Sequence, residues 1–219
     1  MMDRDLFIPD ALQVAPRLLG TLFSVDSPEG TVSLRITEVE AYMGLGSAGP
    51  YDPGSHSRDR RTERNSSMFL GPGHAYVYFS YGMHFAINFV CSPAGIASGV
   101  LLRAGEVVEG ADLARTRRRA RRAGRTIKDA QLARGPGNLA QALGVTRPEH
   151  DGRDLFAAPF RLSDPPQPPG QISSGPRVGV AGSAGGPEFP WRFWLPGEPT
   201  VSAFRRGPNA PSQAGGSSR

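Results

Sequence analysis

The sequence has one cysteine, one lysine and no long hydrophobic run. With Cys91 alone, the chain cannot form an internal disulfide. Its four histidines are scattered, so no spacing resembles a zinc site, and metal catalysis is disfavoured. No segment approaches the roughly 20 apolar residues of a membrane-spanning helix, and the opening residues, MMDRDLF, lack the apolar core of a secretory signal. We therefore expect a soluble, cytoplasmic protein that does not contact membranes.

The basic residues are almost all arginine. Lysine and arginine together number 25, Lys128 is the single lysine, and the formal net charge is +5. Because the planar guanidinium grips phosphate through paired hydrogen bonds, such a surface suits a polyanion such as nucleic acid. Genomic base composition can also favour arginine codons. The charge therefore favours nucleic-acid binding without establishing it.

The length of 219 residues and the 38% hydrophobic content predict one domain with a real core. We predict strands in the first half of the chain, at 19–25, 31–42, 74–81, 84–91 and 99–104. We predict helices in the centre, at 106–123, at 128–134 and in GPGNLAQALG at 135–144. After a proline-rich connection at 163–176, PRVGVA and PWRFWL are typical of short closing strands.

This order of elements predicts an α+β fold rather than a repeating βαβ array. We expect a single domain over 7–204 with a curved, mainly antiparallel sheet, a protruding β-hairpin and flanking helices. Residues 1–6 and 205–219 are polar or rich in glycine and proline, so we expect a mobile N-terminus and a disordered C-terminal tail.

The segment 31–42 carries two glutamates. Strand alternation places six side chains on one face: Val32, Leu34, Ile36, Glu38, Glu40 and Tyr42. A carboxylate beside buried surface costs several kcal/mol unless it is paired. The pattern therefore indicates either ion pairs with arginine at the end of the strand or a catalytic use of the carboxylates.

Two other functions fit parts of this pattern. Glu38 and Glu40 could be the acid and the nucleophile of a retaining sugar hydrolase, because alternate strand residues lie about 6.5 to 7 Å apart. The basic surface alone also fits a noncatalytic nucleic-acid binding module.

The segment YVYFSYGMHF predicts two aromatic-rich strands joined tightly around Gly82, which can supply the positive φ of a turn. Tyr81 lies at the predicted tip, where a large aromatic has the shape of a wedge that replaces an extruded base. The alternative is a tyrosine folded back on its own hairpin. Tyr76, Tyr78 and Phe85 could line a stacking pocket or simply form core.

Two stretches are rich in arginine. The segment SHSRDRRTERNSSMF has neither helical nor strand periodicity and indicates an ordered basic loop. A second run, Arg115 to Arg125, has too many arginines for one helix face, and such runs are usually solvated surface. GPGN at 135–138 could present backbone N–H groups to a phosphate, although a glycine pair is a weak motif.

Together these segments resemble the mammalian-type alkyladenine, or 3-methyladenine, DNA glycosylases. The matching runs are TEVEAYMG, DPGSHS, MFLGPGHAYVYFSYGMHFAINFV and GVLLRAGEVVEG, followed more loosely by GPGNLAQALG, PRVGV and PWRFW. They occur in the family's order and cover about residues 7 to 203. The resemblance implies one α+β domain, monomeric and without metal or cofactor. It also implies action on alkylated or deaminated purines in double-stranded DNA, in a bacterial-type cytosol at the nucleoid.

The resemblance also implies roles for individual residues. Glu40 matches the general base, and Arg103 matches an arginine close to that base and to the flipped nucleotide's backbone. Tyr42, His56 and Tyr78 match the residues that sandwich the extruded purine.

The remaining roles concern selectivity and the duplex. Asn88 matches the asparagine that excludes guanine by crowding its exocyclic amine. Tyr81 matches the intercalating residue, and we group Met83 with it. We assign DNA-backbone contacts to five arginines: Arg58, Arg60, Arg61, Arg64 and Arg177. Asn138 stands where many relatives have lysine, and the loop after His56 also departs from the family's pattern.

These roles predict a hydrolysis in which Glu40 stabilises positive charge at C1′ and accepts a proton from the attacking water. Glycosylases that also cut the strand use an amine. Because Lys128 lies far along the chain from EVEAY, we predict a monofunctional enzyme that leaves an abasic site.

Overall fold

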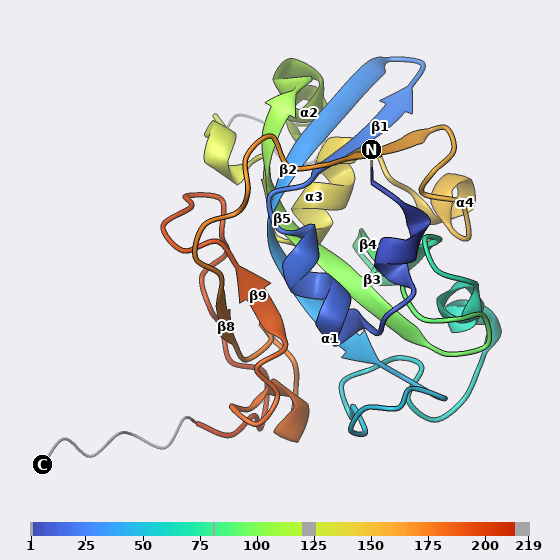
Figure 1. Cartoon of the computed structure of the whole chain (residues 1–219). Helices are drawn as coiled ribbons and strands as arrows, with labels where there is room; N and C mark the ends of the chain where they lie inside the picture. Colours follow the sequence, from blue (N-terminus) through green and yellow to red (C-terminus); the bar gives the residue numbers. More distant parts are fainter. Residues whose placement is uncertain (1, 81, 120–125, 213–219) are drawn as a thin grey trace, which may run out of the picture.

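A computed structural model describes residues 2–80, 82–119 and 126–212, and its centre is a sheet of nine strands (Figure 1). The strands are β1 (Leu22–Ser27), β2 (Gly30–Met43), β3 (Ala75–Ser80), β4 (His84–Val90), β5 (Ser98–Glu109), β6 (Ala133–Arg134), β7 (Phe160–Ser163), β8 (Ser173–Gly175) and β9 (Arg192–Trp194). Each pairing between these strands is antiparallel. The predicted α+β class with a mainly antiparallel sheet is confirmed.

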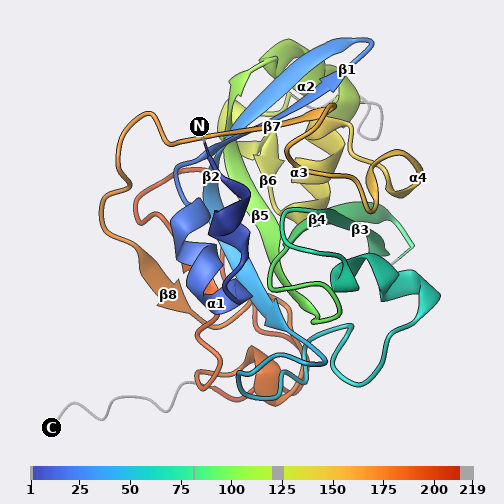
Figure 2. The same ribbon diagram turned by 45° about the vertical axis from the view of Figure 1, so that its right-hand side comes forward.

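The two longest strands, β2 and β5, form the spine of the sheet. The main path runs β3-β4-β5-β2-β1-β7. Beyond β1, the same edge of β2 pairs with β9 through Glu38–Glu40, and β9 pairs with β8. Figure 2 shows β8 on one side of this spine and the β3–β4 hairpin on the other. The spine therefore lies between two flanking pieces that are far apart in sequence.

Short helices surround the sheet. The α-helices are α1 (Ala11–Val14), α2 (Ala111–Arg119), α3 (Pro136–Leu143) and α4 (Arg147–His150). The 3-10 turns are η1 (Arg4–Phe7), η2 (Ala15–Leu18), η3 (Glu63–Phe69), η4 (Asp129–Gln131) and η5 (Ser183–Gly185). Helix α3 begins with proline in its first turn and ends at Gly144 in the left-handed conformation, as helix chemistry favours. Its buried Leu139 and Leu143 join the core.

Three predicted elements differ from the structure. The helix predicted from residue 106 begins only at Ala111, because β5 continues to Glu109 by pairing with β2. The segment 128–134 forms η4 and then β6, which pairs with β5. PRVGVA at 176–181 is not a strand, whereas β8 lies within the predicted proline-rich connection. In β5, β6 and β8, strand pairing prevails over local composition.

The predicted single face for the side chains of 31–42 is wrong. Ile36 pairs with Gly105, and Val39 pairs with Leu102. Both strands thus advance by three residues from one pair to the next, and the register is irregular between the two pairs. An odd step reverses which face a side chain occupies. Val32, Leu34 and Ile36 join the hydrophobic core, and beyond the irregularity the core members are instead Val39, Ala41 and Met43. The even-numbered residues Glu38, Glu40 and Tyr42 thus lie on the opposite face.

Both ends of the described chain contact the domain. Met2 is buried, and Arg4 forms two hydrogen bonds of 2.8 Å with the carboxylate of Asp154. Near the other end, the carbonyls of Arg205 and Pro208 accept hydrogen bonds from Gly179 and Gly182. Residues 205–210 of the predicted tail therefore lie against the loop 179–182. Residues 213–219 lie outside the described part.

Candidate active site

A cavity of about 870 Å³ opens over the face of the sheet that carries Glu40. The hairpin β3–β4 and the segment 178–181 wall it, together with the loop 53–56. Of the described residues, the charged side chains that line it are one carboxylate and three arginines: Glu40, Arg64, Arg103 and Arg147. This excess of positive charge suits an anionic ligand.

Strand register brings distant residues together on the floor of the cavity. Glu40 lies opposite Leu101 of β5, Leu101 opposite Asn88 of β4, and Asn88 opposite Tyr76 of β3. Directly paired residues project from the same face. One row across four strands therefore aligns Glu40, Leu101, Asn88 and Tyr76, all of which line the cavity.

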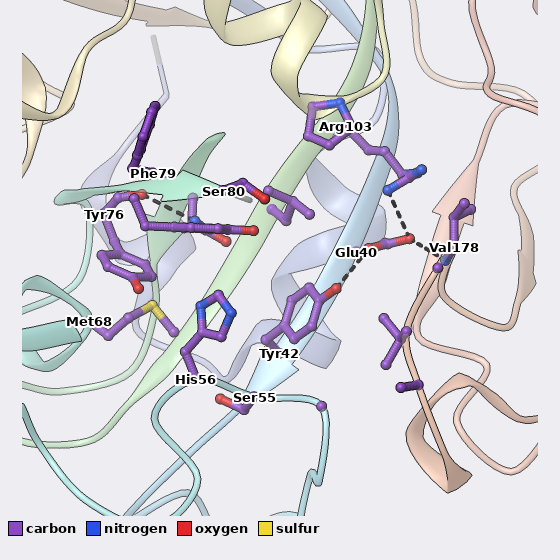
Figure 3. A pocket seen from close by; sticks show the side chains of 18 of the residues that line it. Glu40, Tyr42, Ser55, His56, Met68, Tyr76, Phe79, Ser80, Arg103 and Val178 are labelled. Carbon is purple, nitrogen blue, oxygen red and sulfur yellow. Dashed lines mark hydrogen bonds and ion pairs between the residues drawn. The ribbon is translucent and has the colours of Figure 1, made fainter. Parts of the chain in front are cut away.

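The Glu40 carboxylate is held by donors on both of its oxygens (Figure 3). Its Oε1 accepts a hydrogen bond of 2.7 Å from the backbone N–H of Val178 and lies 3.4 Å from Nη1 of Arg103. Its Oε2 accepts one of 2.9 Å from the hydroxyl of Tyr42. The side chain is only 1% exposed, although it borders the cavity. These contacts fix the carboxylate in one orientation.

Glu38 has a different environment, although it lies two residues before Glu40. It is fully buried and does not line the cavity. Its Oε1 lies 2.6 Å from Nε of Arg192 and 3.0 Å from Nε of Arg103, and its Oε2 accepts from the N–H of Ser202 at 2.8 Å. Glu38 is thus a satisfied structural carboxylate, as the ion-pair alternative predicted.

Arg103 links the two glutamates. Its side chain is 10% exposed, and it lies within ion-pair distance of both carboxylates. Burial works against its charge, but the attraction of Glu40 and Glu38 outweighs burial and raises the pKa of Arg103. The arginine therefore stays charged at the edge of the cavity.

The three predicted stacking residues surround the same space. The ring centroids of His56 and Tyr78 lie 4.7 Å apart, with their planes at 89°. Burial, and then the adjacent Glu40, raises the pKa of Tyr42 well above its usual value. The pKa of His56 is lowered, first because neighbouring atoms shield its ring from water and then because Arg64 and Arg58 are positively charged. At neutral pH the cavity therefore presents a protonated Tyr42 hydroxyl and an uncharged imidazole.

Asn88 and Tyr76 lie at the end of the four-strand row that is farther from Glu40. Nδ2 of Asn88 donates to the carbonyl of Tyr76 at 3.1 Å, which fixes the orientation of the amide. The Tyr76 ring stacks on Tyr78, with centroids 5.6 Å apart. Figure 3 shows Tyr76 and Phe79 across the cavity from Glu40.

The residues predicted to contact the duplex differ in their exposure. Arg58, Arg60, Arg61 and Arg64 are exposed, and Arg64 lines the cavity itself. Met83 is 58% exposed at the turn of the β3–β4 hairpin. Tyr81, the predicted wedge, lies outside the described residues. These roles stay predictions.

Arg177, the fifth arginine predicted to contact the DNA backbone, is buried. Its side chain has no exposed surface, because it is enclosed behind Tyr42 and forms a buried ion pair with Asp52 at 2.6 Å. A phosphate cannot reach the guanidinium without displacing this packing.

Comparisons with known proteins cover nearly the whole chain. Residues 5–199 match the family model described as methylpurine-DNA glycosylase. A protein of Leifsonia xyli is 54% identical over 205 residues, 94% of this chain and 93% of that protein. A Streptomyces avermitilis protein is 50% identical over 93% of this chain and 92% of its own length. One from Mycobacterium leprae is 42% identical over 95% and 91%. All three carry, as a provisional name, 3-methyladenine DNA glycosylase.

The chain belongs to the methylpurine-DNA glycosylase family. It is accordingly a DNA repair enzyme, a hydrolase that acts on N-glycosyl bonds in DNA.

Sequence reasoning missed three parts of this candidate site. The Val178 N–H that holds Glu40 is a backbone group, and no side-chain motif reveals it. Arg147 lines the cavity from α4, a short helix that the sequence does not distinguish. Asp52 lies within DPGSHS, so a signal existed, but its partner is 125 residues away.

In the second arginine run, Arg115 to Arg125, most of the described arginines form ion pairs or hydrogen bonds. Arg115 forms ion pairs with Asp112 and Asp129, and Arg117 forms one with Glu29. Arg118 donates to Asn138 on α3. Residues 120–125 of the run lie outside the described part.

Two further findings concern the described part of the chain. No three histidine, cysteine, aspartate or glutamate side chains there gather as a metal site requires. None of its helices has the length and apolar content to cross a membrane.

Proposed function

We propose that this glycosylase flips alkylated or deaminated purines, of the 3-methyladenine and hypoxanthine type, out of duplex DNA. It then hydrolyses the N-glycosidic bond with a water activated by Glu40. The observation that carries the proposal is the position of Glu40, at the wall of an aromatic-lined cavity with donors on both oxygens. The provisional names of the relatives support the 3-methyladenine part.

Flipping requires a slot that compensates for lost stacking, which costs a few kcal/mol. Tyr42, His56 and Tyr78 line such a slot. An uncharged His56 suits it, because a protonated imidazole would repel a purine that already carries positive charge after alkylation. Arg64, which lines the cavity, and the exposed Arg58, Arg60 and Arg61 supply contacts for phosphates on either side of the extruded nucleotide.

Bond cleavage gives the sugar oxocarbenium character, so a carboxylate near C1′ stabilises developing positive charge. An ionised carboxylate only accepts hydrogen bonds, and each contact described for Glu40 comes from a donor. Glu40 can then take a proton from water as that water attacks C1′. The products are a free base and an abasic site.

The sugar-hydrolase alternative needs two carboxylates at the substrate. Glu38 is fully buried among Arg192, Arg103 and Ser202 and does not reach the cavity. A second catalytic carboxylate is thus lacking among the described residues that line it.

Strand cleavage by a Schiff base is equally disfavoured. Lys128, the only lysine, is exposed and is absent from the lining of the cavity. We therefore propose a monofunctional enzyme.

The test is incubation of the enzyme with duplexes that each carry one lesion, with the undamaged duplex as control. We expect release of free 3-methyladenine and hypoxanthine, and strands that stay intact until alkali cleaves the abasic site. Absence of base release would reject the function. A covalent adduct trapped by borohydride would reject the monofunctional mechanism.

A further inference from the structure

The Asp52–Arg177 ion pair lies directly behind the proposed active site. Nη1 and Nη2 of Arg177 donate to the two carboxylate oxygens of Asp52 at 2.7 and 2.6 Å. Both side chains have no exposed surface. A two-pronged arginine–carboxylate contact fixes orientation as well as distance. The pair is therefore a rigid joint.

This joint connects three separate segments. Arg177 also donates to the carbonyl of Ala41 in β2 at 3.0 Å and to that of Ala184 at 3.2 Å. Asp52 accepts from the N–H of Met43 at 3.2 Å and from that of Gly54 at 2.9 Å. The end of β2, the loop that carries His56 and the segment that carries Val178 are thus tied at one point.

The joint also lies beside the two residues that donate hydrogen bonds to Glu40, Tyr42 through its hydroxyl and Val178 through its N–H. The guanidinium of Arg177 lies 4.5 Å from the centre of the Tyr42 ring, whose hydroxyl donates to Glu40. The next residue, Val178, donates its N–H to the other oxygen of Glu40. A shift of Arg177 would therefore move both donors relative to the carboxylate.

Gly54 makes room for this arrangement. A Cβ at Gly54 would lie 2.8 Å from Nη2 of Arg177, too close for the guanidinium to keep its position. The Nε of Arg177 is buried and has no hydrogen-bond partner among the described residues. Burying an unpartnered donor is costly, and a buried ion pair is often no more stable than packed apolar residues. Stability alone does not explain the pair.

We propose that Asp52 and Arg177 are positioning residues that hold Tyr42 and the Val178 N–H against Glu40. The inference rests on the proposed function, because it assigns the pair to the same reaction. Misplacing catalytic groups by about 1 Å can cost about 100-fold in rate. The pair is expected to affect the chemical step, whereas duplex affinity depends mainly on phosphate contacts elsewhere.

The experiment compares two variants of the full chain. Arg177→Lys keeps the buried charge but loses the two-pronged contact. The double variant Asp52→Asn/Arg177→Met removes both charges, so neither is left unpaired in the interior. For each we expect the single-turnover rate of base release at saturating enzyme to fall between about tenfold and 100-fold. We expect the Kd for the lesion duplex to stay within about threefold of wild type.

The control is Arg4→Met/Asp154→Asn, which removes another arginine–aspartate pair, in which Nη2 of Arg4 donates to both carboxylate oxygens of Asp154 and neither residue lines the cavity. It should release base at the wild-type rate. Should the double variant fail to fold, Arg177→Lys alone decides. Wild-type release by Arg177→Lys, or an equal loss in the control, would overturn the inference. Base release by the wild-type enzyme in the same assay separates that outcome from failure of the proposed function.

Discussion

The two halves of β2 carry similar alternating patterns but serve different purposes. In the first half, Val32, Leu34 and Ile36 face the hydrophobic core. In the second half, Glu38, Glu40 and Tyr42 occupy the opposite face, because the pairing with β5 is irregular between Ile36 and Val39. One strand can therefore anchor the core at one end and present Glu40 and Tyr42 to the cavity at the other.

The two carboxylates of the second half differ just as clearly. Glu38 is enclosed by two arginines and Ser202, whereas Glu40 borders the cavity. Both are glutamates, and they lie two residues apart in the same strand. Their contacts separate them: the side chain of Arg192 and Ser202 cover Glu38, whereas Val178 and Tyr42 hold Glu40 beside the cavity. The following changes test this difference, beginning with the largest expected effect.

Glu40→Gln should abolish most catalysis and leave the fold intact. The amide cannot accept the proton from water, so the single-turnover rate of base release should fall by about 10² to 10⁴-fold. Binding to a lesion duplex, measured by fluorescence anisotropy, should be retained. Release at the wild-type rate would remove Glu40 from the mechanism.

Glu38→Ala should instead lower the stability of the fold. Loss of this carboxylate leaves Arg192 and Arg103 buried beside each other without their shared partner. Breaking such a pair costs about 3 to 5 kcal/mol, so the free energy of unfolding in urea should fall by that amount. Glu106→Ala, which removes a half-exposed partner of Arg35, is the control and should cost about 1 kcal/mol or less. A Glu38→Ala variant of wild-type stability would contradict the structural role.

Tyr42→Phe should have a smaller effect on catalysis than Glu40→Gln. The ring remains for stacking, but Oε2 of Glu40 loses a hydrogen bond of 2.9 Å. A hydrogen bond to a charged group contributes about 1.5 to 3 kcal/mol. If a water molecule takes over part of that contribution, base release should be about tenfold slower. Tyr51→Phe, at an exposed tyrosine bonded to Asp59, should have no effect on release. If Tyr42→Phe were equally silent, the hydroxyl would have no part in holding Glu40.

Arg64→Ala should produce the smallest change, a shift in the titration of His56. The charge of Arg64 helps to lower the pKa of His56, so its removal should raise that pKa toward the ordinary value near 6.5. As pH falls, the variant imidazole should therefore become charged before the wild-type one does. NMR titration of the ring proton at low salt would detect the shift, since salt screens an exposed charge. An unchanged or lowered pKa would contradict the assigned cause.

The sequence was sufficient to predict the fold class, the five main strands and the residues that gather in the cavity. The strands follow from local alternation, and the cavity residues follow from the resemblance of motifs such as EVEAY to the glycosylase family. The face that Glu40 occupies could not be predicted, because the reversal between Ile36 and Val39 arises from pairing with β5. The burial of Arg177 was also hidden, since its partner Asp52 is brought close only by tertiary structure.

The most direct test of the role of Glu40 is a crystal structure of the Glu40→Gln enzyme bound to a duplex that contains hypoxanthine. The extruded base should lie between Tyr42 and the side chains of His56 and Tyr78. C1′ of its sugar should face the side chain of residue 40 closely enough for one water to fit between them. A nucleotide that leaves the stack but keeps its sugar away from residue 40, behind Tyr42 or Val178, would contradict the mechanism.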